Sequence, residues 1–375
     1  MRAWFFTAFL IVSCASLSTA NAAESLAEKL TPLLDAHEGK VTCSVKHLKT
    51  DVSFTRDAEV PMPTASLIKL AVMVEAYRQA EAGKVDLKKT LTLTTDDKVP
   101  GSGILTTHFS AGMTLPLQDA IHLMMVYSDN TATNLVLDQV GLAATNKTME
   151  SLNLPNTKIH SKVFRGASSI LPERSKEFGL GSTTAGEMVQ LLELLDQGKL
   201  ASDSSTGAMR RHLALCESKR LSRDLPANVK VLQKTGSVNA VRTVAGIIET
   251  SSGNVAVCVL TNENKDRRWT DDNAGEVLSS KIAKIVFDHF QTGPAATDKA
   301  VLKLGSQGTP VEKLQAALNA QLKPSPELTL DGQFGPLTRS AVIAWQKNNQ
   351  LPLTGEIDLA AWKKFNLAPD DFTKP

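Results

Sequence analysis

The chain has 375 residues, which is long for one ordinary core and suits one large domain with a small one. Its 41 basic and 39 acidic residues give a formal net charge of +2, and no basic tail stands out. A nucleic-acid partner is therefore not expected.

The first 23 residues read as a secretory signal. Arg2 precedes an apolar run from Ala3 to Val12, and small residues then lead to Ala20-Asn21-Ala22, an A-x-A cleavage pattern. A second interpretation is lipoprotein processing, with lipid attached at Cys14. Beyond this segment no apolar run approaches the roughly 18 residues that a membrane span needs. We therefore expect a periplasmic or secreted protein, either free or tethered by that lipid.

Three cysteines would remain after cleavage, Cys43, Cys216 and Cys258, an odd number without metal-ligand spacing. At most one disulfide can form, and Cys43 and Cys258 lie in strand-like runs where a buried free thiol is expected. The seven histidines show neither His-x-His nor His-Glu-x-x-His. Neither a metal nor a cofactor is expected.

Hydrophobic spacing predicts a first domain over residues 24–291. An amphipathic helix at 24–38 opens it, and a helix at 274–290 closes it. Between them we expect strands at 41–48, 52–56, 241–249 and 255–261, and helices at 66–82, 117–127, 131–140 and 185–198. Strands at both ends that enclose helices predict an α+β fold, an α/β sandwich. Its N- and C-terminal strands would pair in one antiparallel sheet, flanked by a mostly helical subdomain.

A break rich in Pro, Gly and Ala over 292–300 is the expected linker. Residues 301–367 would form a second, three-helix domain, with helices at 311–320, 338–348 and 359–365. A unit of this size is small but can fold.

Ser66-Leu67-Ile68-Lys69 follows a proline-rich stretch, which places Ser66 near a helix N-terminus. Lys69 then lies on the same helix face, within reach of the Ser66 hydroxyl. A nucleophile beside a base is the minimal unit of covalent catalysis. Taken alone, the tetrapeptide would read as a capping serine and a solvated lysine.

Two further motifs contain polar groups suited to a substrate site. Ser128-Asp129-Asn130 ends one apolar helix and opens another, although a helix cap alone would explain these residue types. Lys234-Thr235-Gly236-Ser237 precedes the strand at 241–249. Its glycine would let another molecule approach the backbone, and a lysine with two hydroxyls suits a carboxylate.

Each motif occurs once, and together in this order they form the set found in class A β-lactamases and penicillin-binding proteins. From residue 24 to residue 291 the chain resembles that family, and the stretches 101–105 (GSGIL) and 128–135 (SDNTATNL) agree with it as well. The resemblance implies the serine β-lactamase and DD-peptidase fold.

The resemblance also implies residue roles at matching positions. Ser66 would be the acyl-accepting nucleophile and Lys69 its base or proton relay. Ser128 would pass a proton to the leaving nitrogen with help from Lys234, and Asn130 would hold the substrate amide. The mechanism requires Lys69 to lose its proton near neutral pH, and both burial and the charge of Lys234 favour this loss.

The resemblance also implies which groups would surround the reacting carbonyl. The backbone N–H groups of Ser66 and Ser237 would form the oxyanion hole. Thr235, Ser237 and Arg242 would bind the substrate carboxylate, since an arginine suits bidentate pairing.

One feature of class A β-lactamases is not found. Their Glu-x-x-Leu-Asn stretch supplies the Glu that activates a water for deacylation, but the corresponding residues near 164–168 are not acidic. Glu173 and Glu177 are the carboxylates available nearby, each either a deacylation base in a remodelled loop or a solvated side chain. A true β-lactamase and a DD-peptidase with slow deacylation both remain open.

Residues 301–367 resemble the peptidoglycan-binding domain of wall hydrolases. The matching stretches are 304–308 (LGSQG), 311–318 (VEKLQAAL), 331–338 (DGQFGPLT), 345–346 (WQ) and 351–355 (LPLTG). Peptidoglycan is therefore an expected partner, because an enzyme held on the wall meets a higher effective substrate concentration.

The sequence thus predicts an exported, monomeric serine hydrolase of the class A β-lactamase family that is anchored to peptidoglycan. A β-lactam or a D-Ala-D-Ala peptide would acylate it at Ser66. The alternatives are a penicillin-binding DD-peptidase with slow deacylation and a non-turnover, wall-anchored penicillin-binding or sensor protein. The presence of Lys69, Ser128 and Lys234 argues against the non-turnover protein.

Overall fold

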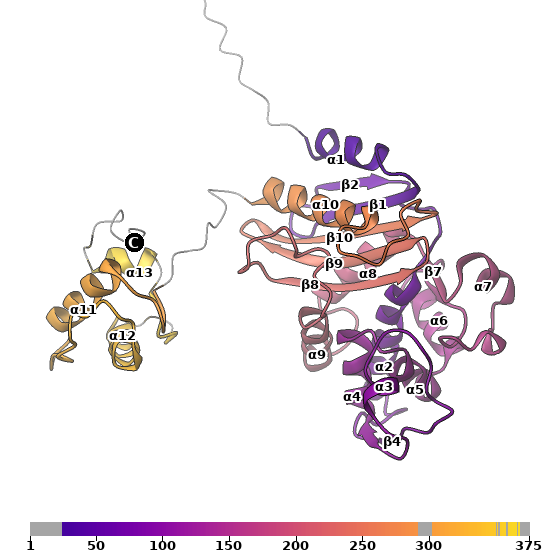
Figure 1. Ribbon diagram of the computed structural model, residues 1–375, viewed down its shortest axis with the longest axis horizontal. Helices are drawn as coiled ribbons and strands as arrows, with labels where there is room; N and C mark the ends of the chain where they lie inside the picture. Colours follow the sequence, from indigo (N-terminus) through magenta and orange to yellow (C-terminus); the bar gives the residue numbers. More distant parts are fainter. Residues whose placement is uncertain are drawn as a thin grey trace, which may run out of the picture.

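The computed structural model describes residues 25–291, 302–349, 351, 353–357, 359–365 and 367. The predicted signal segment, Cys14 and the predicted linker at 292–300 lie outside the described residues. The N-terminal part, residues 25–291, contains a five-stranded antiparallel sheet covered by helices, which confirms the predicted α+β fold (Figure 1).

The sheet has the strand order β2-β1-β10-β9-β8. Strands from the two ends of this part pair as predicted, because β1 lies between β2 and β10 in antiparallel register. The strands are β1 (Lys40–His47), β2 (Ser53–Arg56), β8 (Val231–Val238), β9 (Val241–Thr250) and β10 (Gly253–Asn262).

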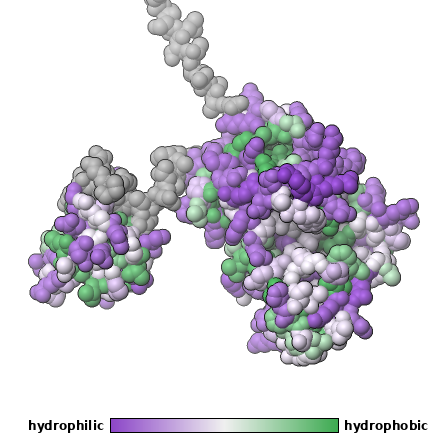
Figure 2. All heavy atoms as spheres, in the orientation of Figure 1, coloured by the Kyte–Doolittle hydropathy of each residue, from purple (hydrophilic) through white to green (hydrophobic). Residues whose placement is uncertain are grey.

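The two faces of the sheet bury different apolar clusters. Successive strand residues point to opposite faces, so Val257 and Val259 of β10 pack toward α1 (Leu26–Asp35) and α10 (Ala274–Phe290). Ala256 and Cys258 of the same strand pack toward the helices on the other face. Figure 2 shows mostly hydrophilic residues over the end of this part that carries α1 and β2.

The helix α2 (Lys69–Glu81) runs through the helical subdomain. Its residues from Lys69 to Tyr77 are buried, which is typical of a helix surrounded by others.

The other helices are α3 (Leu105–His108), α4 (Leu117–Val126), α5 (Asn130–Val140), α6 (Leu142–Ser151), α7 (Pro172–Phe178), α8 (Ala185–Asp196) and α9 (Asp203–Ala214), with the 3-10 turns η1 (Ala65–Ile68) and η2 (Gly166–Ser168). Short strands pair as β3 (Met62–Pro63) with β7 (Gly181–Thr183), β7 with β6 (Lys158–Ile159), and β4 (Thr90–Thr92) with β5 (Thr114–Pro116).

The C-terminal part, from residue 302 to residue 367, has an apolar core of its own. Its helices are α11 (Thr309–Gln321), α12 (Pro336–Asn348) and α13 (Leu359–Lys364). Phe334, Trp345 and Trp362 fill the core and are at most 2% exposed. None of the helices in the described stretches of the chain is long and apolar enough to cross a bilayer.

Candidate active site

Ser66 lies in η1, the single 3-10 turn that leads directly into α2. Ala65 has a φ of +46°, in the left-handed region that residues other than glycine rarely adopt. β8 packs tightly on this turn, because a Cβ at Gly236 would lie 2.4 Å from the Thr64 carbonyl oxygen. The glycine of the Lys-Thr-Gly motif thus permits this packing, and it also lines the pocket described below.

Ser128 stands at the sharp corner between α4 and α5, with a φ of +54°. The Asp129 carboxylate holds this corner by accepting hydrogen bonds from three backbone N–H groups. They belong to Ala132 at 2.8 Å, Ile104 at 2.7 Å and Leu105 at 2.8 Å. Asp129 therefore positions its neighbours and does not face the substrate pocket.

Two buried lysines converge on Ser128. The Lys69 Nζ donates to the Ser128 backbone oxygen at 2.6 Å and lies within hydrogen-bond distance of the Ser128 Oγ, at 3.2 Å. It also donates to the Asn130 Oδ1 at 3.0 Å. The Lys234 Nζ donates to the same Ser128 Oγ at 3.0 Å, and both lysines are 0% exposed. Residues from all three motifs therefore meet around one hydroxyl.

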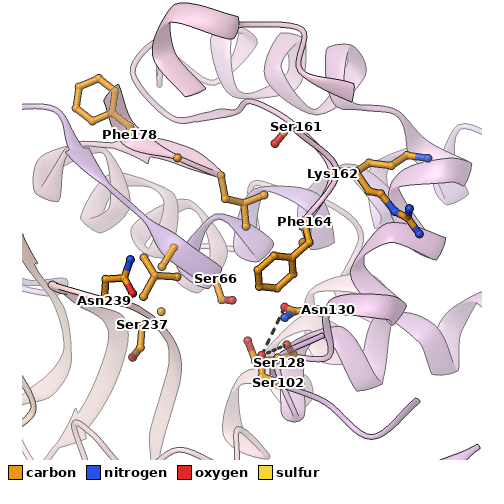
Figure 3. A pocket seen from close by; sticks show the side chains of 18 of the residues that line it. Ser66, Ser102, Ser128, Asn130, Ser161, Lys162, Phe164, Phe178, Ser237 and Asn239 are labelled. Carbon is orange, nitrogen blue, oxygen red and sulfur yellow. Dashed lines mark hydrogen bonds between the residues drawn. The ribbon is translucent and has the colours of Figure 1, made fainter. Parts of the chain in front are cut away.

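The arrangement differs in one respect from the sequence expectation. The hydrogen bonds that the described residues make with the Lys69 amine go to Ser128 and Asn130, and none goes to Ser66. Figure 3 shows the Ser66 side chain in the same pocket as Ser128 and Asn130. Ser128 is thus the group through which Lys69 and Lys234 both act.

Burial lowers the pKa of both lysines. For Lys69, burial and the positive charge of Lys234 hold the pKa well below its ordinary value. Burial lowers the pKa of Lys234 to about 8, and the Arg220 guanidinium acts in the same direction against an opposing effect of Cys216. At neutral pH this favours an uncharged Lys69 that accepts a proton and a Lys234 that keeps its charge.

The motif residues border a pocket of about 890 Å³. Those that line it directly are Ser66, Ser128, Asn130, Thr235, Gly236 and Ser237. Aromatic and basic side chains complete the wall, among them Lys162, Phe164, Arg165, Phe178 and Trp269. Within the described part of the chain, no carboxylate lines this pocket.

Of the two alternatives given for Glu173 and Glu177, the structure agrees with solvated side chains. Both lie exposed on α7 and do not line the pocket, whereas Ser175 and Phe178 of the same helix do. Residues four apart share a helix face, and here that face points to solvent. Neither carboxylate is placed to activate a water beside Ser66.

Phe164 lies in the stretch 164–168, where class A β-lactamases would have their deacylating Glu. Its φ is +53° and its side chain is 64% exposed, and Figure 3 shows the ring close to Ser66 and Asn130. The side chain of Asn134 fixes this loop by two hydrogen bonds to the Val163 backbone, at 3.0 Å and 2.8 Å. An apolar ring therefore borders the pocket on this side.

The structure also corrects the expectation for Arg242. Its side chain is 1% exposed, and its guanidinium donates to the backbone oxygens of Asn239, Val241 and Arg268. Because alternate strand residues point to opposite faces, this side chain leaves β9 toward Glu276 of α10. Arg242 does not line the pocket, and its guanidinium is held by backbone oxygens and by Glu276.

Arg220 places a guanidinium beside the pocket instead. Its Nη2 donates to the Ser237 Oγ at 2.9 Å, and its Nη1 donates to the Thr243 backbone oxygen at 2.6 Å. Glu276 forms an ion pair with it. Sequence analysis missed Arg220 because it lies in the connection between α9 and β8, with no motif around it.

Comparisons with known proteins agree with this geometry. Residues 25–290 match the beta-lactamase enzyme family, and residues 307–365 match the putative peptidoglycan binding domain. A beta-lactamase from Proteus vulgaris is 29% identical over 140 residues, which are 36% of this chain and 46% of that protein. The chain thus spans less than half the length of the curated relatives that it matches.

Solved structures share the fold. A beta-lactamase from Sphaerobacter thermophilus has a TM-score of 0.63 and 29% identity, covering 72% of this chain and 98% of that one. A mutant of PBP-A in an acyl-enzyme complex with penicillin G has a TM-score of 0.62 and 21% identity, covering 71% and 96%. The chain therefore belongs to the beta-lactamase enzyme family and carries a peptidoglycan-binding domain toward its C-terminus.

Proposed function

We propose that the protein is an exported, wall-associated serine DD-peptidase that also binds penicillins. A peptide ending in D-Ala-D-Ala or a β-lactam acylates Ser66, and the ester formed with a penicillin is hydrolysed slowly. One observation carries this choice. The acylation groups meet around Ser128, yet no carboxylate lines the pocket in the part of the chain that the structure describes.

Acylation uses the groups around the two lysines. The Ser66 Oγ attacks the substrate carbonyl carbon and its proton passes to the uncharged Lys69 amine. The N–H groups of Ser66 and Ser237 hold the oxyanion that forms. Ser128, hydrogen-bonded to Lys69 and Lys234, then delivers its proton to the leaving nitrogen. It takes up the proton that Lys69 received, so that Lys69 is again uncharged.

The carboxylate end of the substrate binds next to β8. Thr235 and Ser237 present hydroxyl groups to it, and the charge of Lys234 attracts it. Arg220, whose charge is paired with Glu276, orients the Ser237 hydroxyl through its hydrogen bond to the Oγ. The Asn130 side-chain amide holds the amide of the acyl side.

Deacylation distinguishes peptides from penicillins. A cleaved peptide releases its amine, which frees space for a water that Ser128 and Lys69 can deprotonate. The amine of an opened penicillin stays attached to the acyl group and keeps that space occupied. A carboxylate on the other side of the ester would overcome this block, but Phe164 lies there and Glu173 and Glu177 face solvent.

The C-terminal part supports peptidoglycan as the natural substrate. A domain of this family on the same chain would hold the enzyme near wall peptides and raise their effective concentration. A role outside the cytoplasmic membrane also agrees with the predicted signal segment. An enzyme that only destroyed diffusing antibiotic would gain less from such a domain.

A second candidate function is that of a β-lactamase. The Proteus vulgaris and Sphaerobacter thermophilus relatives are beta-lactamases, at 29% identity in each case. In that case a loop movement would have to bring a carboxylate to the ester. The buried lysine pair and Ser128 argue against a third candidate, a sensor without turnover.

The test is release of D-alanine from a soluble peptide that ends in D-Ala-D-Ala. We expect wild-type protein to release it, Ser66→Ala to lose at least about 1000-fold in rate, and the exposed control Ser151→Ala to keep it. No release by wild-type protein, together with rapid turnover of nitrocefin, would favour the β-lactamase instead.

A further inference from the structure

The stretch 101–105 (GSGIL) packs directly against the corner of the chain at Ser128. Gly101 has a φ of +90°, and a Cβ on it would lie 2.7 Å from the Asn130 Nδ2. A larger residue there would therefore disturb Asn130. The Ser102 backbone oxygen accepts a hydrogen bond from the Asn130 backbone N–H at 3.0 Å. The backbone of Ser102 is thus held next to two residues of the site.

The Ser102 side chain bonds to the oxygens that hold the Lys69 amine. Its Oγ donates to the Ser128 backbone oxygen at 2.9 Å and lies 3.5 Å from the Asn130 Oδ1. Lys69 donates to the same two oxygens, at 2.6 Å and 3.0 Å. Figure 3 shows the Ser102 side chain beside Ser128 and facing Asn130. A hydroxyl and an amine thus share two acceptors.

The two shared oxygens favour the charged form of the amine. Each can only accept a hydrogen bond, since one is a backbone carbonyl and the other belongs to a side-chain amide. A hydrogen bond from an ammonium is stronger than one from a neutral amine. A second donor that occupies the same oxygens weakens this preference. An uncharged amine can still give one N–H to each oxygen, and it keeps its lone pair for the hydroxyl groups of the site.

Other groups act on the Lys69 amine through burial and charge. Burial lowers its pKa most, the positive charge of Lys234 on β8 lowers it further, and the Asp129 carboxylate at the start of α5 raises it. Ser102 differs from both neighbours because it carries no charge and acts through oxygens that the amine itself uses. A change at Ser102 therefore leaves both charges in place.

We propose that Ser102 is a positioning residue for acylation, whose hydroxyl weakens the hold of the two shared oxygens on a charged Lys69 amine and so favours the uncharged base. Ser102 acts through Lys69 and Ser128, and no bond forms or breaks at its own oxygen. This inference rests on one part of the proposed function, the acylation of Ser66. It does not depend on how the ester is cleared.

The experiment measures how fast a fluorescent penicillin labels the full-length protein, over a range of penicillin concentrations and of pH. Saturation separates the rate constant of the acylation step from the binding of the drug. In Ser102→Ala the oxygens should hold the ammonium more tightly, so the acid limb of this rate constant should move up by about 0.5–1 pH unit. Below the midpoint of that limb the rate constant should fall about three- to ten-fold, with little change in binding.

Two further variants show whether the hydroxyl is responsible. Ser102→Thr keeps a hydroxyl and should keep the acid limb of the wild-type protein. Ser110→Ala is a control at an exposed serine outside the pocket, and it should change neither the rate constant nor its pH dependence. If thermal unfolding shows that Ser102→Ala does not fold, Ser102→Cys replaces it, because a thiol is a weak donor of similar shape.

An acid limb that stays in place in Ser102→Ala overturns the inference. A loss confined to the binding of penicillin also overturns it, because Ser102 would then only contact the substrate. A shift that Ser102→Thr shows equally would mean a repacked corner and not a lost hydroxyl, and it has the same consequence. If the wild-type protein is not labelled at Ser66, the proposed function itself fails; if it is labelled and the limb does not move, only this inference fails.

Discussion

At the scale of single residues, the site depends on two buried lysines with different tasks. Lys69 must lose its proton to accept the one from Ser66, and Lys234 must keep its proton to attract a carboxylate. Burial lowers both pKa values, and the positive charge of Lys234 lowers the pKa of Lys69 further. The geometry thus makes the two amines differ at neutral pH.

The pKa of Lys234, about 8, sets an upper limit on the working pH. Below that pH the amine is charged and attracts the substrate carboxylate, and above it the amine becomes neutral. We expect the second-order rate constant for acylation by penicillin to fall as the pH rises through about 8. In Lys234→Arg this fall should vanish, since an arginine stays charged. If the variant keeps the same fall, another group causes it.

Arg220 is expected to contribute to carboxylate binding although no sequence motif contains it. Arg220→Ala should lower kcat/KM for acylation about 10- to 100-fold, because a hydrogen bond to a charged group is lost. Arg223→Ala is a matched control in the same connection, since the Arg223 guanidinium bonds to Asp271 and Ser280 away from the pocket. Thermal unfolding checks that both variants fold. Equal losses in the two variants would contradict the role given to Arg220.

At the scale of elements, the contact of β8 with η1 fixes the distance between the motifs. A Cβ at Gly236 would meet backbone atoms at 2.4 Å and 2.8 Å, and backbone cannot move aside as a side chain can. We expect Gly236→Ala to lower the free energy of unfolding by about 1–3 kcal/mol, as overpacking does, and to slow acylation strongly.

The matched control for this variant is Gly207→Ala on α9, where the nearest atom to a new Cβ is the end of the flexible Arg211 side chain, at 3.5 Å. There an alanine should stabilise the protein by about 0.5–1 kcal/mol, because glycine is a poor helix residue. Urea unfolding measures both effects. If the two variants unfold alike, the contact between β8 and η1 is looser than described.

The sequence predicts long periodic elements well and close contacts poorly. The helices at 117–127 and 274–290 and the strands at 241–249 and 255–261 are found within a few residues of their predicted limits. Sequence analysis predicts no strand over 231–238, because Lys234 and Gly236 interrupt the apolar pattern, and β8 forms there by pairing with β9. Periodicity describes one element at a time and does not report what packs against it.

Site prediction had the same limit. The meeting of the three motifs could be predicted, because the family pattern in which they occur together implies a shared site. Arg220 and Trp269 have no local pattern, and Arg242 was chosen from its strand position without knowledge of the face on which its side chain leaves. Which of two nearby arginines bonds to the Ser237 side chain depends on tertiary packing.

At the scale of the whole molecule, the C-terminal part has a core that shares no residue with those of the N-terminal part. We therefore expect a chain that ends at residue 291 to keep its rate on a soluble D-Ala-D-Ala peptide within about two-fold. The same chain should no longer sediment with purified peptidoglycan, whereas the full chain should. Sedimentation of the shortened chain with the wall would place the binding surface elsewhere.

At this scale the central expectation is that the protein forms a Ser66 ester readily and clears a penicillin from it slowly. The most direct measurement is a chase, in which protein labelled with a fluorescent penicillin is mixed with excess unlabelled drug and the label on Ser66 is followed by peptide mapping. We predict that the label persists for hours and that Ser66→Ala takes up none. Loss of the label within seconds, with penicilloic acid accumulating, would contradict the account.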